Sequence, residues 1–227
     1  LVDTEEEAPK PVQNIEKIVG LDLGLTHLVI DSNGNKTDNP RFLRRAEANL
    51  RRKQKALSRC QKGSRGRAKA RHALAKAHQR LANARADFQH KLSRQLVDEN
   101  QAIIVETLKV KNLMKNRKLA KHIGDASWHS QILKLEYKAR QAGKHLGKID
   151  QWFPSSKTHH ECGYRVDSMP LSVRRWDCPG CGATGIDRDV NAALNILSQG
   201  ILKLRAEGLS VPANGGLRKS SHALVAA

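Results

Sequence analysis

The sequence predicts an α/β protein in which one mixed β-sheet carries two insertions, a long basic helical hairpin and a small cysteine-rich module. Three observations predict this class. Apolar runs of strand length occupy residues 18–25 and 102–108, leucines recur every seven residues between 41 and 98, and three of the four cysteines cluster near the C-terminus. We divide the chain into a linker (1–15), a first core part (16–154) that contains the hairpin (41–98), the cysteine-rich insertion (155–185), a closing core helix (186–206) and a disordered tail (207–227).

The charge of the chain points to a polyanionic partner. Its 227 residues carry a formal net charge of +19, with a pI near 10.2, which is more than solubility requires. Nucleic acid is the first candidate and an anionic membrane surface the second, and no run of about 18 apolar residues predicts a membrane span. Residues 1–11 show no secretion signal and no initiator Met, so we interpret them as a linker cut from a longer protein.

The first predicted strand, Ile18–Leu25, contains a single carboxylate, Asp22. Burying an ionised Asp is costly unless a cation or a hydrogen-bond network compensates it. Gly20 and Gly24 flank this residue, and a glycine in a strand lets another backbone or a ligand approach closely. Taken alone, a strand-end Asp that caps a turn is the more common case. A second strand follows the bend at 24–26, and the turn signal at 31–34 predicts a third.

Residues 41–98 predict a long antiparallel helical hairpin closed along a narrow apolar seam. The stretch 41–100 holds 18 Lys and Arg against 4 Asp and Glu, a net charge of +14. Charge of one sign on a stiff hairpin repels itself, and contact with phosphates would offset that cost. Because aromatic residues are almost absent, we expect contact with the nucleic-acid backbone rather than with bases. The residues assigned to this contact are Arg44, Arg45, Arg51, Arg52, Lys53, Arg59, Arg65 and Arg67.

The second half of the core supplies two more acidic positions. The apolar run 102–108 carries Glu106, a helical period follows from 128 to 144, and residues 148–153 form a further strand candidate. A final helix begins near Asp187, whose default role is the N-cap. Asp189 then lies in the first helical turn.

The cysteine-rich insertion has the ligand spacing of a zinc ribbon. His159-His-Glu-Cys162 and Cys178-Pro-Gly-Cys181 are two short pairs separated by about 15 residues, as expected for two tight turns that complete a tetrahedral site. We assign Zn²⁺ to His159, Cys162, Cys178 and Cys181. His160 is the weaker alternative for the fourth ligand, and Cys60 is interpreted as an ordinary thiol.

Asp22, Glu106 and Asp189 thus occupy a first strand, a later strand and the start of a closing helix. Clustered carboxylates repel and have raised pKa values unless divalent cations neutralise them, and hard oxygen ligands favour Mg²⁺ or Mn²⁺. Two such ions can activate a water and stabilise the leaving oxygen in phosphodiester hydrolysis. The order of elements is that of an RNase H-like nuclease.

Five motifs in order resemble the TnpB family of transposon-encoded proteins. They are Gly20-Leu-Asp-Leu-Gly-Leu-Thr26, Ile104-Val-Glu-Thr-Leu108, Gln151-Trp-Phe-Pro-Ser-Ser-Lys-Thr158, Cys178-Pro-Gly-Cys181 and Asp187-Arg-Asp-Val-Asn-Ala-Ala193, and the resemblance runs from about residue 16 to 205. It implies a RuvC-type nuclease domain with an inserted zinc ribbon, and RNA-guided cleavage of double-stranded DNA with guide RNA and target DNA as partners. It also implies that Asp22, Glu106 and Asp189 are the catalytic acids, with Asp187 as the alternative third ligand.

The chain departs from the family pattern in two places. His159 stands where members usually carry a Cys, and the family's N-terminal half, which holds guide RNA and reads the target-adjacent motif, is absent. We therefore expect a C-terminal portion that keeps the cutting site and loses most target selection. A nucleic-acid-binding remnant without cleavage is the alternative, and a junction resolvase is disfavoured by the ribbon. The expected location is the bacterial or archaeal cytoplasm, near the nucleoid.

Overall fold

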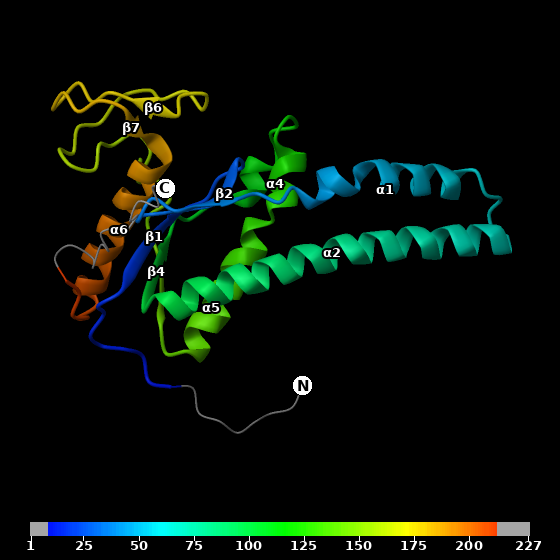
Figure 1. The fold of residues 1–227 in the computed structure, drawn as a ribbon, viewed down its shortest axis with the longest axis horizontal. Coiled ribbons are helices and arrows are strands. Elements are labelled where there is room, and N and C mark those ends of the chain that lie inside the picture. The colour runs from blue at the N-terminus through cyan, green and yellow to red at the C-terminus, as the bar shows by residue number, and fades with distance from the viewer. Residues whose placement is uncertain (1–8, 213–227) are drawn as a thin grey trace, which may run out of the picture.

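The computed structural model describes residues 9–212 and has a five-stranded mixed β-sheet at its centre (Figure 1). The strand order is β3-β2-β1-β4-β5. Strands β1, β4 and β5 run parallel, whereas β2 and β3 pair antiparallel as a meander on β1. The α/β class with a mixed sheet is confirmed. The strands are β1 (Ile18–Asp22), β2 (His27–Asp31), β3 (Lys36–Asp38), β4 (Ala102–Val105) and β5 (His145–Lys148).

Helices cover both faces of the sheet because the side chains of its central strands alternate between two apolar clusters. Val19 and Leu21 of β1 pack with α2 and α5, whereas Ile18 and the β4 residue Ile104 pack with α6. The helices are α1 (Phe42–Ser58), α2 (Arg65–Glu99), α3 (Val110–Leu113), α4 (Ala120–Ala126), α5 (Trp128–Gln141) and α6 (Arg188–Ala206).

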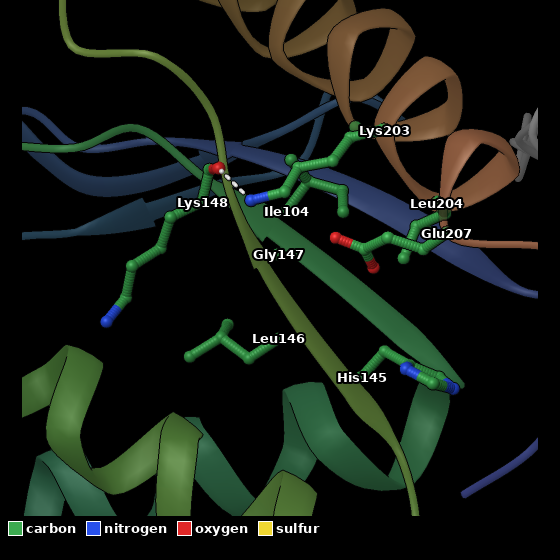
Figure 2. Close-up of a pocket in the computed structure, with 9 residues that line it drawn as sticks. Ile104, His145, Leu146, Gly147, Lys148, Lys203, Leu204 and Glu207 are labelled. Carbon is green, nitrogen blue, oxygen red and sulfur yellow. Dashed lines mark hydrogen bonds between the residues drawn. The ribbon is translucent and has the colours of Figure 1, made fainter.

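Two glycines let α6 lie directly on the sheet. A Cβ on Gly20 would stand 2.3 Å from the carbonyl oxygen of Ala193, and one on Gly200 would stand 2.3 Å from a side-chain carbon of Ile104. At the sheet edge, Lys203 of α6 donates to the carbonyl of Lys148 over 3.2 Å, across a pocket that none of the predicted site residues lines (Figure 2). The close approach that the sequence indicated at Gly20 is therefore made by α6.

Helices α1 and α2 form an antiparallel pair that extends well beyond the sheet (Figure 1). Leu50, Leu74 and Ala77 are buried between them, which gives the pair the narrow seam that the heptad spacing indicated. At the root of the pair, the buried carboxylate of Asp125 accepts from the Leu43 amide at 3.0 Å and from Arg85 at 2.9 Å. This contact fixes the hairpin on α4.

The structure corrects the sequence analysis at two places in the core. The last strand of the sheet is 145–148 rather than 148–153, because its ladder with β4 begins at His145 and a turn follows at 151–152. The disordered tail expected from residue 207 is wrong for residues 207–212, where Val211 is buried against α6 and Ser210 bridges to Asn14. The remainder of that expected tail lies outside the described residues. No helix among residues 9–212 is long and apolar enough to cross a membrane.

Candidate catalytic edge and metal centre

Asp22 and Glu106 lie side by side at the carboxyl edge of the parallel strands. Asp22 ends β1, Glu106 directly follows β4, and the register pairs Leu21 with Val105, the residues before them. Both share the strand face of Ile18 and Ile104, because side chains on one face recur every second residue. The two carboxylates therefore belong to the face that α6 covers.

Helix α6 brings the third acid to the same place. Asp189 lies in its first turn, is 8 % exposed, and acts electrostatically on Asp22. Its carboxylate accepts from two guanidinium groups: Arg188 at 3.0 Å and Arg174 at 3.2 Å. Arg188 also donates to the carbonyl of Leu171 at 3.2 Å, so that it joins the helix start to the preceding loop.

The site raises the pKa of its two strand acids. Burial raises the pKa of Asp22 well above its usual range, the charges of Glu106 and Asp189 raise it further, and Arg188 and Arg174 only partly offset this. Burial also raises the pKa of Glu106 to about 7, against the opposing effect of the Leu23 backbone amide. Carboxylates that repel one another at close range form the kind of site that a hard divalent cation such as Mg²⁺ or Mn²⁺ would neutralise.

The three carboxylates are neighbours, but they are not preassembled as a tight ligand set. Within the part of the chain that the structure describes, the four ribbon side chains are the only group of three or more His, Cys, Asp or Glu residues whose ligand atoms all lie within 4.8 Å of one another. At the sheet edge, by contrast, the arginines partly balance the acidic charge, and the oxygens of the three acids do not all come within that distance of one another.

Asp187 has a different role from Asp189, two residues later. Its side chain accepts from the amides of Asp189 and Val190, each at 3.1 Å, and thereby caps α6. Lys36 of β3 pairs with the same carboxylate at 2.5 Å. Burial would raise the pKa of Asp187, but Lys36 and the two amides lower it overall. The geometry favours Asp189 over Asp187 as the acid that joins Asp22 and Glu106.

The four ribbon side chains form a compact His/Cys cluster. His159 Nδ1 lies 3.1 Å from Cys162 Sγ and 3.4 Å from Cys181 Sγ, and the sulfurs of Cys162 and Cys178 are 3.5 Å apart. Neighbouring donors of a tetrahedral zinc site lie roughly 3.5–3.8 Å apart, given bonds of about 2.0–2.3 Å. The cluster could therefore hold a metal ion, and its donor set suits zinc.

Two copies of the same turn build this cluster. In the first turn, the His159 amide donates to the Tyr164 carbonyl, and the Gly163 amide donates to the His159 carbonyl. In the second turn, the Cys178 amide donates to the Ala183 carbonyl, and the Gly182 amide donates to the Cys178 carbonyl. Both glycines have φ of +74°, the left-handed conformation that glycine adopts without strain. Burial would raise the pKa of the Cys178 thiol, but the backbone amides of the second turn lower it and favour the thiolate that binds metal.

The remaining His and Cys candidates lie outside the cluster. The His160 amide donates to Asn191 on α6 at 2.9 Å, and its ring lies 3.5 Å from the Ser198 hydroxyl. Cys60 is a free thiol at the tip of the hairpin, donating to the Ala56 carbonyl.

The basic residues of the hairpin line two shallow grooves. One runs along α1 and is lined by Arg51, Arg52, Lys55 and Arg59 with two alanines. The other lies at the hairpin root and includes Arg44 and Arg45. Arg65 is exposed, Lys53 is half-buried, and Arg67 donates to the carbonyls of Leu57 and Cys60. Arg67 therefore closes the hairpin turn, which the sequence analysis did not anticipate.

Comparison with known proteins identifies the family. A model of the OrfB_IS605 family, described as "Probable transposase", matches residues 1–117, and a model described as "Cas12f1-like, TNB domain" matches residues 128–196. The chain belongs to the TnpB family.

Curated relatives carry matching names. A "Putative RNA-guided DNA endonuclease" of Streptomyces pristinaespiralis is 47% identical over 86% of this chain and 48% of its own length. The "Putative RNA-guided DNA endonuclease InsQ" of Escherichia coli is 28% identical over 88% of this chain and 53% of its own length. The chain thus spans about half the length of these TnpB-family relatives.

A solved structure shares the fold. It is titled "Cryo-EM structure of the Cas12f1-sgRNA-target DNA complex", and a chain in it superposes with a TM-score of 0.58 at 17% identity, over 83% of this chain and 51% of that one. The mixed α/β architecture of this TnpB-family chain is therefore similar to that of Cas12f1.

Sequence reasoning missed the cations that surround the carboxylates. Arg174 and Arg188 pair with Asp189, and Lys36 pairs with Asp187. Arg188 stands between the two acids in the sequence, which was a usable signal. Arg174 and Lys36 approach from the ribbon and from β3, and only the fold brings them to this edge.

Proposed function

We propose that this chain is the RuvC-type nuclease domain of an RNA-guided DNA endonuclease and hydrolyses DNA phosphodiesters with Mg²⁺ or Mn²⁺. The observation that carries the proposal is the meeting of Asp22, Glu106 and Asp189, from β1, β4 and α6, at one edge of the mixed sheet. The names of the relatives support the same activity. A bacterial or archaeal cytoplasmic location, where DNA and guide RNA are present together, belongs to the same proposal.

The residues at this edge have different proposed roles. A divalent cation held by the three carboxylates would supply Lewis-acid chemistry, polarising the phosphate and lowering the pKa of a water. Asp22 and Glu106 are fixed by adjacent strands, so their spacing does not depend on a loop. Arg188, which bonds both Asp189 and the loop at Leu171, orients the third carboxylate.

We further propose that the His/Cys cluster binds Zn²⁺ as a structural ion. Its four donors, His159, Cys162, Cys178 and Cys181, close a site with no position left for substrate, as in structural zinc sites. The strand pair β6 (Arg175–Trp176) and β7 (Ile186–Asp187) leads from the cluster straight into α6 (Figure 1). A metal there would hold the loop that carries Arg174 against Asp189.

The basic hairpin is the proposed contact for the backbone of target DNA or guide RNA. Arg52 and Arg59 line one groove and are exposed to solvent, where phosphates can reach them, and Arg51 in the same groove also pairs with Glu47 at 3.1 Å. Each neutralised phosphate releases counterions, so binding should weaken steeply as salt rises. An affinity independent of salt would remove this part of the proposal.

A nucleic-acid-binding module without cleavage is the second candidate. It is favoured by the pairing of Asp189 with Arg174 and Arg188, and by the larger separation of the carboxylate oxygens compared with the zinc ligands.

A cleavage assay separates the two functions. Labelled single-stranded DNA is incubated with the full chain and Mg²⁺ or Mn²⁺, and Asp22→Ala and Asp189→Ala should each slow cleavage by about 100-fold or more, since metal ligation is worth several kcal/mol. Asp98→Ala is the matched control, because it makes the same change at an α2 side chain that is 54% exposed. Equal cleavage by wild type and both alanine variants would overturn the nuclease assignment. Binding without cleavage by the wild type would favour the second candidate.

A further inference from the structure

One tryptophan stands in solvent beside the catalytic edge. Of the three tryptophans, Trp128 and Trp176 are buried, whereas Trp152 is 76% exposed. An indole ring is normally covered in a folded protein because exposing it forgoes a large burial of apolar surface. Lys109 lies over this ring, with its ammonium 5.5 Å from the ring centroid. A single surface cation–π pair is a weak reason to keep a tryptophan uncovered.

The backbone beneath Trp152 is held rigidly on both sides. Its amide donates to the carboxylate of Asp150 at 2.7 Å, and the next residue, Phe153, packs into the core under α6. Further along, Asn195 of α6 donates to the carbonyl of Ser155 at 2.8 Å. The ring is therefore presented from a fixed turn and not from a mobile loop, which lowers the entropy cost of binding to it.

This turn belongs to the same sheet edge as the carboxylates. The Ile149 amide donates to the Val105 carbonyl, one residue before Glu106, and Thr107 donates to the Ile149 carbonyl at 2.6 Å. Trp152 follows three residues later. Glu106 thus directly follows β4, and Trp152 lies in the turn that follows the neighbouring parallel strand β5.

The segment that begins with Lys109 is basic. Residues 109–121 contain six Lys or Arg and no acid, beginning with the Lys109 that contacts the ring. An aromatic face combined with a cationic groove is how proteins hold single-stranded nucleic acid: the bases stack, and the cations follow the backbone. The groove along α1 offers cations without an aromatic face, so it lacks this second element.

We propose that Trp152, with Lys109, is a stacking site for an unpaired nucleobase of the DNA strand that enters the carboxylate site. This assignment rests on the proposed nuclease function and names the form of its substrate, a single strand rather than an intact duplex. In a duplex the base faces are covered by their neighbours, so the ring can stack only on an unpaired or terminal base.

Tryptophan fluorescence tests the assignment in Mg²⁺-free buffer, where no cleavage occurs. Because the other two tryptophans are buried, stacking on single-stranded oligothymidylate should quench the signal of Trp152 selectively. Trp152→Ala should abolish that quenching and weaken binding by roughly 5- to 150-fold, the range for loss of one stacked base. Trp152→Phe keeps an aromatic face and should retain most of the affinity, whereas Trp152→Leu, a bulky apolar side chain without such a face, should behave as the alanine variant.

A strand with abasic positions supplies the reciprocal control. Wild type should bind it about as weakly as Trp152→Ala binds the normal strand, and the variant should not distinguish the two strands. Equal wild-type affinity for both strands, or an alanine or leucine variant that binds like wild type, would overturn the stacking site. Quenching by oligouridylate but not by oligothymidylate would overturn the assignment of the stacking site to DNA. The fluorescence readout needs no cleavage. Quenching can therefore be observed when the nuclease assay shows no activity, and activity when there is no quenching, so the two proposals are tested independently.

Discussion

The two candidate metal sites differ in how completely the fold assembles their ligands. The His/Cys cluster places four donors within 4.8 Å of one another. The acidic site brings Asp22, Glu106 and Asp189 close enough to raise the pKa of Asp22, and engages Asp189 with two arginines.

This difference follows from charge and from chain distance. Each half of the His/Cys cluster is a turn of a few residues, closed by its own backbone hydrogen bonds and a glycine with positive φ. Its donors are neutral until they ionise, so their approach costs little. The acids come from β1, β4 and α6 and repel one another as they approach. A local turn can preassemble a soft-ligand site, whereas a site of carboxylates stays strained until cations enter.

The largest expected effect is on the folding of the cysteine-rich insertion, when one of its four ligand residues is replaced. Cys178→Ser should unfold the cysteine-rich insertion, because structural zinc supplies apparent binding energies of about 10–16 kcal/mol in small zinc modules. Cys60→Ser is the matched control, since it makes the same change at a thiol outside the cluster. Elemental analysis and circular dichroism measure the result. Less than about half a zinc per wild-type chain would contradict a closed four-ligand site.

A smaller effect, and one that increases stability instead of lowering it, is expected from a substitution at the acidic site. The pKa of Glu106 rises from its ordinary value of 4.5 to about 7 on folding, so between these pH values the folded protein keeps a proton that the unfolded chain has released. This contribution stabilises the fold at low pH and is lost as pH rises to about 7. Glu106→Gln should therefore stabilise the Mg²⁺-free protein by roughly 1–3 kcal/mol above pH 7, with little gain below 4.5.

Urea unfolding of wild type and Glu106→Gln across this pH range measures the difference. Mg²⁺ should stabilise the wild type and leave the variant nearly unchanged, since the variant has lost one of the negative charges that repel. A stability difference that is constant with pH would show that Glu106 is not strained in the folded state.

The smallest effect is expected at Asp187, where the ribbon joins α6. Asp187→Ala removes an N-cap and should lower the free energy of unfolding by about 1 kcal/mol. It should also reduce the cleavage rate less than Asp189→Ala does. Asp187→Asn keeps a capping side chain and should recover most of the stability while losing the Lys36 ion pair. Thermal unfolding and the cleavage assay report the two quantities. Cleavage lost as completely in Asp187→Asn as in Asp189→Ala would reverse the roles of the two acids.

Much of the fold could be predicted from local patterns. Apolar strands, a turn signal and a heptad stripe are properties of neighbouring residues, so the strands β1 to β4, the paired helices α1 and α2 and the start of α6 could be anticipated. The predicted position of β5 is a few residues too late, because His145–Lys148 are half-buried or exposed at the sheet edge and carry a weak apolar signal. The short helices α3 and α4 had no periodic signal at all.

By itself the sequence determined the kinds of chemistry available: acids in apolar strands, paired His/Cys turns and a one-signed charge surplus. Only the tertiary structure decided how these groups are partnered. It assigned Asp187 to a helix cap and Asp189 to the sheet edge, brought Arg174 to that acid, turned Arg67 inward to close the hairpin and left Trp152 in solvent. The physical reason is that charge and residue type are local properties, whereas an ion pair or an exposed ring depends on which distant segments the fold brings together.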